Sequence, residues 1–184
     1  MYKKKLKKYN LPKLIQLNSF NDKRGKLSRI FCINEFKKKG INFPIKQINH
    51  VIVNKKGTIK GMHFQRQPFS EIKIVNVIKG KIFDIVIDVR KNSKNFLNHK
   101  SFILSSKENK SLLIPKGFAH GFQTLSDNCE IIYCHSEFYK SNKELSINPF
   151  DPKVGIQWPI KVSNISSKDR KTKFIYNDFK GIVI

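Results

Sequence analysis

Short runs of β-branched and aromatic residues, interrupted by turn residues, recur along most of this chain. The clearest signal covers residues 71–90, in which two apolar runs flank Lys79-Gly80. Two apolar runs joined by a short glycine-containing turn predict a β-hairpin. We therefore expect residues 71–90 to form two neighbouring strands that pair with each other.

Further runs of this kind occupy residues 43–53, 58–64, 100–104, 111–114, 121–125 and 130–138. Many short strands at this spacing favour a β-sandwich or a barrel. Helical patterning is scarce: residues 34–39 fit one or two turns, and Ser166 with Asp169 has the spacing of a capping-box-like helix start. The pattern predicts an all-β fold with a few short helices.

The length and the apolar content bound the number of domains. A chain of 184 residues with 39% hydrophobic residues is large enough to fill one sizeable core. No internal repeat and no linker composition divides it. We expect one domain over residues 1–184, with an N-terminal segment at 1–19 and a C-terminal appendage at about 160–184.

The formal net charge of +24 raises the question of a nucleic-acid partner. Only five of the 37 basic residues are Arg, and the lysines are scattered along the chain. Specific contacts to bases and phosphates favour the guanidinium fork of Arg. We expect a solvated lysine-rich surface and no nucleic-acid partner, with an anionic substrate as the alternative use of the charge.

Targeting signals and cysteine usage indicate a cellular compartment. Residues 1–8 are basic, but no apolar run follows them as a secretory signal requires, and no stretch has the length and apolarity of a membrane span. Cys32, Cys129 and Cys134 are odd in number and lack metal-ligand spacing. We expect reduced thiols in a cytoplasmic enzyme that has no membrane partner.

Two of the five histidines, His63 and His120, stand in strands or turns that contain glycine. Glycine at such positions lets a backbone or a ligand approach closely. Each histidine taken alone also fits a hydrogen-bonded structural role. However, Gly57 six residues before His63, and a Pro-x-Gly-x-x-His run that ends at His120, resemble the two motifs of the cupin superfamily. This resemblance implies a double-stranded β-helix, or jelly roll, barrel.

The first motif departs from the pattern of metal-binding cupins. Those proteins usually place a second histidine two residues after the first, where this chain has Gln65, and Glu71 lies too far along the chain to replace it. A neutral amide is a poor ligand for a transition metal, so two histidines would leave an ion undercoordinated. We expect a barrel with no metal ion and no other cofactor.

A longer resemblance extends from Phe20 to about Asp169. The chain resembles the dTDP-4-dehydrorhamnose 3,5-epimerases in an ordered set of segments, at residues 22–25, 47–50, 61–65, 80–84, 88–90, 115–121, 125–127 and 155–159. The resemblance implies a cupin-type epimerase, typically a homodimer in which an N-terminal segment crosses to the partner barrel. The residues before Phe20 are the candidate for that segment.

The same resemblance assigns catalytic roles. It implies that His63 is the general base, that Asp169 orients and charges its imidazole, and that Tyr133 is the general acid. Removing a proton beside a ketone at neutral pH needs a base such as histidine and a positive group that stabilises the enolate. A phenol can return a proton from the opposite face if nearby cations lower its pKa. Tyr133 also fits a structural role as a barrel tyrosine anchored by one hydrogen bond.

Ten further positions fall where the family contacts the sugar, the diphosphate or the nucleoside. They are Arg24, Arg29, Gln47, Asn49, Lys60, Lys73, His120, Tyr139, Glu144 and Lys168. Three positions depart from the family pattern: Lys60 replaces an Arg, Arg29 replaces a Glu, and Ile48 replaces an Asp. Lys60 keeps the charge but loses bidentate geometry, whereas Arg29 reverses the sign.

The leading expectation is an isomerase that inverts C3 and C5 of dTDP-4-dehydro-6-deoxy-D-glucose, which gives dTDP-4-dehydro-L-rhamnose for surface polysaccharide. Three alternatives stay open. The first is an epimerase acting at one carbon, or a ketoisomerase, with a related 4-keto-6-deoxy sugar nucleotide. The second is a non-enzymatic cupin that binds sugar or nucleic acid. The third and weakest is a metal-dependent oxygenase.

Overall fold

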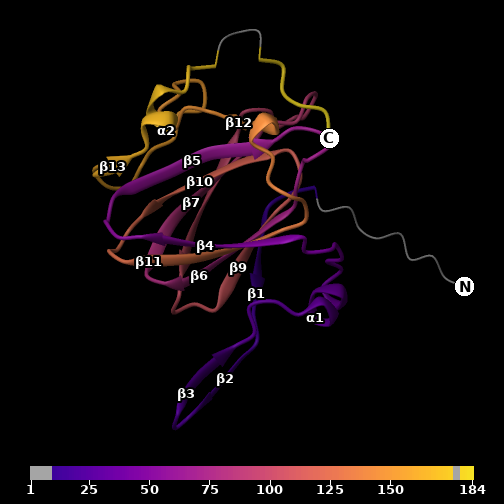
Figure 1. Ribbon diagram of the computed structural model, residues 1–184, viewed down its shortest axis with the longest axis vertical. Coiled ribbons are helices and arrows are strands. Elements are labelled where there is room, and N and C mark those ends of the chain that lie inside the picture. Colours follow the sequence, from indigo (N-terminus) through magenta and orange to yellow (C-terminus); the bar gives the residue numbers. More distant parts are fainter. Residues whose placement is uncertain (1–9, 176–178) are drawn as a thin grey trace, which may run out of the picture.

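Two β-sheets face each other and enclose the interior of the protein (Figure 1). The computed structural model describes residues 10–175 and 179–184, so the basic run at residues 1–8 lies outside the described residues. One sheet has the order β1-β9-β6-β11-β4. The other has the order β12-β5-β10-β7-β8, with β13 also paired to β5. This two-sheet barrel is the predicted cupin-type jelly roll, and the prediction of an all-β fold is confirmed.

The elements follow one another through short turns. Their bounds are β1 Lys13–Gln16, β2 Ser19–Asp22, β3 Gly25–Ser28, α1 Ile33–Lys38, β4 Gln47–Val53, β5 Thr58–Gln65, β6 Lys73–Lys79, β7 Lys81–Asp88, β8 His99–Ser105, β9 Lys110–Ile114, β10 Phe118–Thr124, β11 Cys129–His135, a 3-10 turn Ser141–Lys143, β12 Glu144–Ser146, β13 Asn164–Ile165 and α2 Ser167–Lys171. Every strand predicted from the apolar runs is present, within a few residues of its expected bounds.

The predicted hairpin at residues 71–90 is wrong in its pairing. Both strands exist, but β6 pairs with β9 and β11, whereas β7 pairs with β8 and β10 in the opposite sheet. The chain crosses between the sheets at Gly80, which has φ +83° and where a Cβ would lie 2.6 Å from Ser126 Oγ. Two buried apolar runs look alike whether they pair with each other or lie in facing sheets, so the sequence pattern did not separate the two arrangements.

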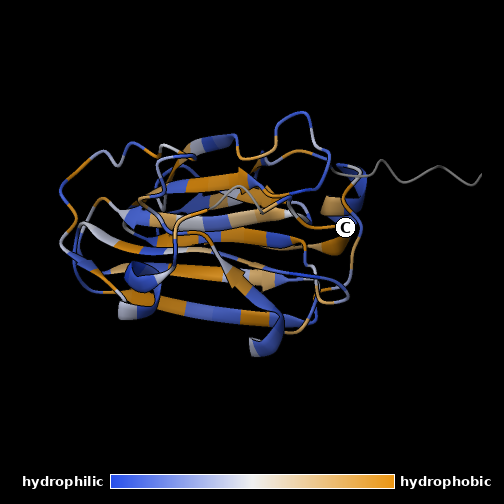
Figure 2. Cartoon of the chain, turned by 90° about the horizontal axis from the view of Figure 1, so that it is seen from above, coloured by the Kyte–Doolittle hydropathy of each residue, from blue (hydrophilic) through white to orange (hydrophobic). Residues whose placement is uncertain are grey.

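The apolar pattern explains how the layers pack. One cluster fills the space between the sheets and includes Val75, Val86, Leu112, Phe122 and Ile131, all essentially without solvent exposure. A second cluster, around Phe36 and Ile74, packs the N-terminal segment onto the outer face of the five-stranded sheet. Figure 2 shows the hydrophobic positions concentrated along the strands and the polar ones along the loops. The interior between the sheets is therefore apolar over much of its length.

Both predicted helices are present. α1 matches the expected turns at residues 34–39, and α2 begins where expected because the Asp169 backbone N–H donates to Ser166 Oγ at 3.0 Å. Five short strands went unpredicted, namely β1, β2, β3, β12 and β13. They have two to four residues each, too few to show a periodicity. Neither helix in the described part of the chain has the length or apolarity that crossing a membrane requires.

The β2–β3 hairpin projects away from the barrel (Figure 1). Its strands pair with each other and with no other strand among the described residues. Phe20 and Leu27 on this hairpin are 57% and 62% exposed. The hairpin therefore leaves two large apolar side chains exposed on the surface of the chain.

Candidate active site

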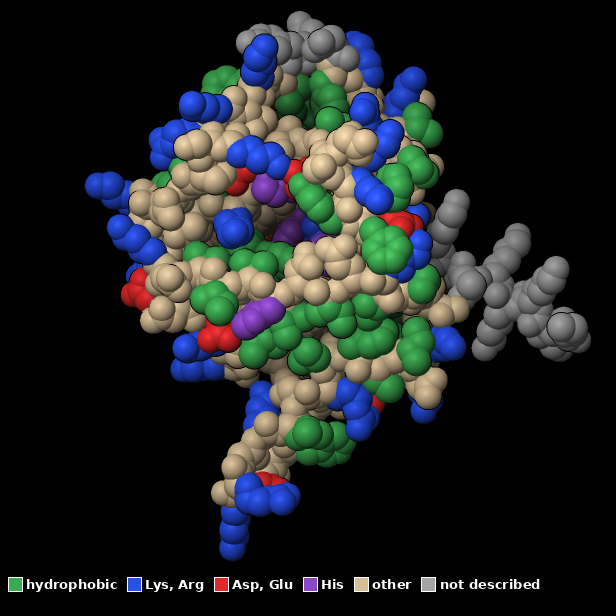
Figure 3. All heavy atoms as spheres, in the orientation of Figure 1, with side chains coloured by type: hydrophobic (Ala, Val, Ile, Leu, Met, Phe, Trp, Pro, Cys, Tyr) green, Lys and Arg blue, Asp and Glu red, His purple; other side chains and the backbone are tan. Residues whose placement is uncertain are grey.

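A cavity of about 190 Å³ opens between the two sheets, and polar side chains from both sheets line it. Its lining consists of Asn49, His63, Phe64, Gln65, Glu71, Lys73, Tyr133, His135, Tyr139 and Glu144. Figure 3 shows histidine and acidic side chains inside a hollow on this face of the molecule. Charged and aromatic groups gather here, whereas the cluster that fills the space between the sheets is apolar.

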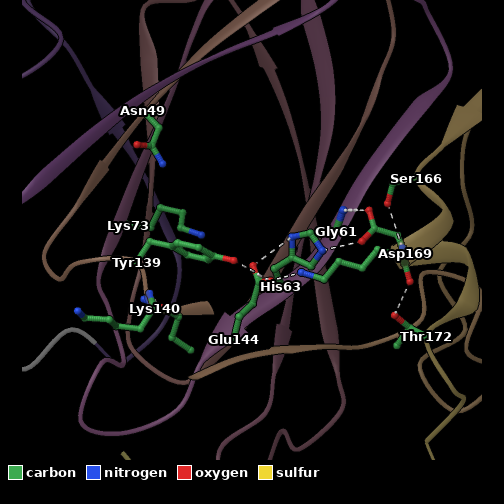
Figure 4. A network of polar contacts seen from close by, with 12 residues as sticks. Asn49, Gly61, His63, Lys73, Tyr139, Lys140, Glu144, Ser166, Asp169 and Thr172 are labelled. Carbon is green, nitrogen blue, oxygen red and sulfur yellow. Dashed lines mark hydrogen bonds and ion pairs between the residues drawn. The ribbon is translucent and has the colours of Figure 1, made fainter. Parts of the chain in front are cut away.

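His63 and Asp169 form an ion pair in the cavity wall (Figure 4). His63 lies on β5, and its Nε2 is 2.7 Å from Asp169 Oδ1. The other carboxylate oxygen of Asp169 accepts the backbone N–H of Gly61 at 3.3 Å. Ser166 caps the short helix α2 that carries Asp169. Both oxygens of the carboxylate are therefore held against the strand that presents the imidazole.

The charge on Asp169 decides which imidazole nitrogen is free. Burial pushes the pKa of Asp169 upward, but the hydrogen bond and charge of His63, with the N–H of Gly61, outweigh it and leave that pKa below its usual value. An ionised carboxylate only accepts hydrogen bonds, so Nε2 of His63 carries the proton. Nδ1 is then the basic nitrogen. It lies on the Glu144 side, 3.9 Å from Glu144 Oε1.

A close approach of two backbones places His63 beside His120. The residues are register partners on β5 and β10. Gly61 has φ +123°, and a Cβ on it would lie only 2.5 Å from the Cα of Gly121. A side chain at Gly61 would push the two strands apart. The glycines that flank the histidines in the sequence are thus the reason that both rings reach one region of the interior.

Tyr133 enters the cavity from the opposite sheet. It lies on β11, and its ring meets the rings of His120 and His135 edge to face, with centroids 5.8 Å and 6.0 Å apart. The expectation that cations lower its pKa is wrong: burial, reinforced by the charge of Asp84, raises the pKa of Tyr133 well above its usual value. The phenol therefore keeps its proton at neutral pH and can donate it, but it is a weaker acid than an ordinary tyrosine.

His120 has a buried partner that the sequence did not indicate. Its Nε2 lies 2.8 Å from Asp84 Oδ2, and both side chains are at most 5% exposed. Complete burial raises the pKa of Asp84, an effect that His120 and Lys73 only partly offset. Asp84 Oδ1 has no hydrogen-bond partner among the described residues. An acidic residue between the apolar residues Phe83 and Ile85 in the middle of β7 was the signal available.

Five of the predicted substrate contacts form the rim of the cavity. Tyr139 donates its hydroxyl to Glu144 Oε2 at 3.4 Å, and Lys168 pairs with the same carboxylate. Gln47 accepts the backbone N–H of Tyr139 at 3.0 Å and donates to Asn49 at 3.0 Å. Tyr139 is 51% exposed. The rim is a connected polar network with one aromatic ring open to a ligand.

Three predicted contacts lie elsewhere in this chain. Arg24 sits at the tip of the β2–β3 hairpin, is 89% exposed at its side chain, and pairs with Asp22 at 2.6 Å. Arg29 pairs with Glu35 at 2.5 Å. Lys60 is exposed on β5 and does not line the cavity. Within one chain, these three side chains do not join the other predicted substrate contacts at the cavity.

Two ionisable residues of the cavity were not predicted as site residues, Glu71 and His135. His135 Nδ1 lies 2.6 Å from Glu71 Oε2, and Glu71 Oε1 lies 3.4 Å from Lys73 Nζ. Burial pushes the pKa of Glu71 upward, but the charge of Lys73 and the contact with His135 outweigh it and lower that pKa. His135 stands two residues after Tyr133 on one strand, so the alternation of a strand places both on the same face. That spacing was the missed signal.

Gln65 stands where metal-binding cupins usually have a second histidine, and its side chain makes hydrogen bonds to the protein backbone. Gln65 donates to the carbonyls of Phe69 and Phe138, both at 3.1 Å, and accepts the N–H of Lys140 at 2.7 Å. Within residues 10–175 and 179–184, no group of three or more His, Cys, Asp or Glu side chains has the arrangement of a metal site. The absence of a metal ion and of other cofactors stays a prediction.

Comparisons with known proteins point to one family. The family model of dTDP-4-dehydrorhamnose 3,5-epimerase matches residues 10–177. The dTDP-4-dehydrorhamnose 3,5-epimerase of Methanothermobacter thermautotrophicus is 36% identical over 163 residues, which cover 87% of each chain. The crystal structure of the Legionella pneumophila dTDP-6-deoxy-D-glucose-3,5-epimerase in complex with dTDP-4-keto-L-rhamnose is 31% identical, with a TM-score of 0.86 and coverage of 94% of each chain.

A third relative has a different outcome at the sugar. A 3'-monoepimerase from Streptomyces bikiniensis, solved in complex with dTDP-quinovose, is 26% identical with a TM-score of 0.82. The match covers 89% of the present chain and 83% of that one. The fold is therefore shared by enzymes that differ in the number of carbons they invert.

Proposed function

The chain belongs to the dTDP-4-dehydrorhamnose 3,5-epimerase family, and from this membership we propose that it inverts C3 and C5 of dTDP-4-dehydro-6-deoxy-D-glucose. It is an isomerase that acts on a sugar nucleotide. The observation that carries the proposed chemistry is the placement of His63 and Tyr133, which line one cavity from opposite sheets. A group on each side of the sugar ring is what inversion of a carbon needs.

The proposed reaction at each carbon has two proton transfers. Nδ1 of His63 takes the proton from the carbon beside the 4-keto group, and the electron pair of the broken C–H bond becomes the enolate. The charge of Asp169 stabilises the imidazolium that results. Lys73 or His120 supplies the positive charge that the enolate oxygen requires. Tyr133 then delivers its proton to the opposite face of the carbon, and the enolate returns to the ketone.

The rim of the cavity is the proposed nucleotide site. Tyr139 has an exposed ring on which a nucleobase can stack. Lys168 lies beside it and supplies a charge for the diphosphate, although Glu144 pairs with that ammonium. Gln47 and Asn49 supply neutral hydrogen-bonding groups. Local charge at the rim, not the net charge of the whole chain, accounts for binding of an anionic ligand.

A homodimer completes the proposed site. The projecting β2–β3 hairpin carries Arg24, and an isolated two-stranded hairpin has little stability in water by itself. Its exposed Phe20 and Leu27 need an apolar surface. Packing of this hairpin against a second copy would bring Arg24 and Arg29 toward the partner's cavity. The two arginines that miss the cavity of their own chain would then bind the substrate of the other.

We also propose one domain over the whole chain and a cytoplasmic location. The single domain is supported by strand pairing: β1, near the N-terminus, pairs with β9, and β13, near the C-terminus, pairs with β5. The location is supported by the free thiols of Cys32, Cys129 and Cys134, which fit a reducing compartment.

Solvent deuterium exchange tests the proposed reaction. The purified protein is incubated with dTDP-4-dehydro-6-deoxy-D-glucose in deuterated water, and the sugar carbons are followed by NMR. We expect deuterium at C3 and at C5. No incorporation at either carbon, in this sugar and in a panel of related 4-keto sugar nucleotides, would contradict the proposal. His63→Asn should abolish exchange, whereas His50→Asn, the same change on a histidine paired with Glu130 away from the cavity, should not.

An epimerase that acts at one carbon is the second candidate. It is favoured by the similarity to the Streptomyces bikiniensis 3'-monoepimerase. The same experiment separates the two, because a single-site enzyme leaves one of the two carbons free of deuterium.

A further inference from the structure

Glu71 lies between two cationic or ionisable partners inside the cavity. Its Oε1 is 3.4 Å from Lys73 Nζ, and its Oε2 is 2.6 Å from His135 Nδ1. The three side chains are 11%, 13% and 8% exposed, in the order Glu71, Lys73, His135. The proposed reaction uses Lys73 but gives no part to its two neighbours. They form a third carboxylate–imidazole pair, beside those of His63 with Asp169 and of His120 with Asp84.

The hydrogen bonds of His135 define its state. Glu71 is an ionised acceptor, so Nδ1 of His135 carries a proton. The amide of Asn49 faces Nε2 at 3.4 Å and donates to it. Both ring nitrogens are thereby engaged, and the edge-to-face contact with Tyr133 holds the ring plane. The imidazole is a rigid support for the carboxylate.

Lys73 needs such a support because its four-carbon stem is flexible. Its ammonium lies 5.8 Å from the centroid of the Tyr133 ring and lines the same cavity as His63. A buried ammonium also requires a counter-ion to stay charged. Glu71 meets both needs, and His135 keeps Glu71 in place.

We propose that Glu71 and His135 are positioning residues of the epimerase, which hold the Lys73 ammonium charged and aimed at the enolate. This inference rests on the proposed function. It assigns the pair no contact with the sugar. Its effect should therefore fall on turnover and on the pH dependence of turnover, and little on substrate affinity.

The first test is Glu71→Gln, which keeps the size and the hydrogen bonding but removes the charge. We expect kcat for deuterium exchange to fall by about tenfold or more, with KM changed by less than about threefold. Without the carboxylate, the Lys73 ammonium loses its nearest counter-ion and keeps only the interaction with Asp84, so burial disfavours the charged amine more than in the wild type. The descending limb of the kcat–pH profile should therefore move to lower pH, while the ascending limb stays in place.

The second test separates positioning from simple packing. His135→Leu removes the N–H that holds Glu71, and His135→Gln keeps a donor at the same place. We expect His135→Leu to shift the descending limb as Glu71→Gln does, and His135→Gln to restore most of the wild-type profile. His50→Leu is the matched control, since His50 pairs with Glu130 at 3.3 Å outside the cavity. It should leave the profile unchanged.

A third measurement does not depend on activity. The lysine ¹³Cε signal that disappears in Lys73→Arg is titrated by NMR in the wild type and in Glu71→Gln. A lower midpoint in Glu71→Gln supports the inference, and an unchanged midpoint overturns it. An active wild type whose variants keep the wild-type kcat and pH profile also overturns it and leaves the proposed function standing. A wild type that exchanges no deuterium refutes the proposed function, while the lysine titration still reports on the charge held by Glu71.

Discussion

Asp169 Oδ1 lies 2.7 Å from Nε2 of His63, although the two residues are 106 positions apart in the chain. The return of the chain after the barrel makes this contact, because β13 pairs with β5 and α2 follows directly. The carboxylate belongs to a segment outside the barrel core, whereas the imidazole belongs to a central part of β5. The base therefore depends on the docking of the C-terminal segment.

Asp169→Asn tests that dependence. The amide keeps the size of the side chain but removes the charge that stabilises an imidazolium at His63. We expect kcat for deuterium exchange to fall by about 10²- to 10³-fold. A control variant is Asp151→Asn, a buried carboxylate outside the cavity. Equal losses in the two variants would indicate a stability effect instead.

Tyr133→Phe separates proton removal from proton delivery. His63 can still remove a proton in this variant, but the donor on the opposite face is missing. We expect epimerised product to form about 10²- to 10⁴-fold more slowly, while exchange of the substrate's own C–H bonds slows much less. The two rates are read from one NMR time course. Exchange and epimerisation that fall together would argue against Tyr133 as the acid.

Mixed dimers test whether Arg24 acts across subunits. Arg24→Ala and His63→Ala are each expected to be nearly inactive. If Arg24 serves the partner's cavity, a heterodimer of the two has one intact site, so mixing after reversible dissociation should recover up to about a quarter of wild-type activity. If Arg24 acts within its own chain, no site in the mixture is intact. Sedimentation analysis of the mixture verifies that subunits have exchanged.

The lowered pKa of Asp169 predicts a pH-dependent contribution to stability. A carboxyl group whose folded pKa lies below its unfolded value stabilises the fold above the unfolded pKa, and this contribution is lost as the pH falls through the folded pKa. The difference in unfolding free energy between the wild type and Asp169→Asn should therefore stay constant above about pH 5 and shrink as the pH falls below the unfolded pKa of about 3.8.

Asp84→Asn provides the opposite case for the same measurement. Burial raises the pKa of Asp84, so its neutral form is favoured in the folded protein and its ionisation weakens the fold. The difference in unfolding free energy between the wild type and Asp84→Asn should therefore change with pH in the opposite direction to that for Asp169→Asn. Urea unfolding at a series of pH values measures both differences. The same sign of change in both variants would contradict these assignments.

Local patterns in the sequence located the strands and the helix start, whereas the roles of His63, Asp169 and Tyr133 came from the resemblance to the epimerase family. The alternation of apolar residues located the strands, and glycines beside His63 and His120 marked the place where two backbones approach. The cap of Ser166 on α2 was readable from a three-residue spacing. Such features depend on neighbours within a few positions, so a single sequence contains them.

The tertiary structure alone decided which strands pair and how each charge is surrounded. The apolar runs of β6 and β7 entered facing sheets instead of one hairpin, because partners from distant parts of the chain cover them. The raised pKa of Tyr133 and the contact of Glu71 with His135 likewise depend on burial and on groups brought together across the barrel. Desolvation and long-range pairing are properties of the packed chain, and no local pattern encodes them.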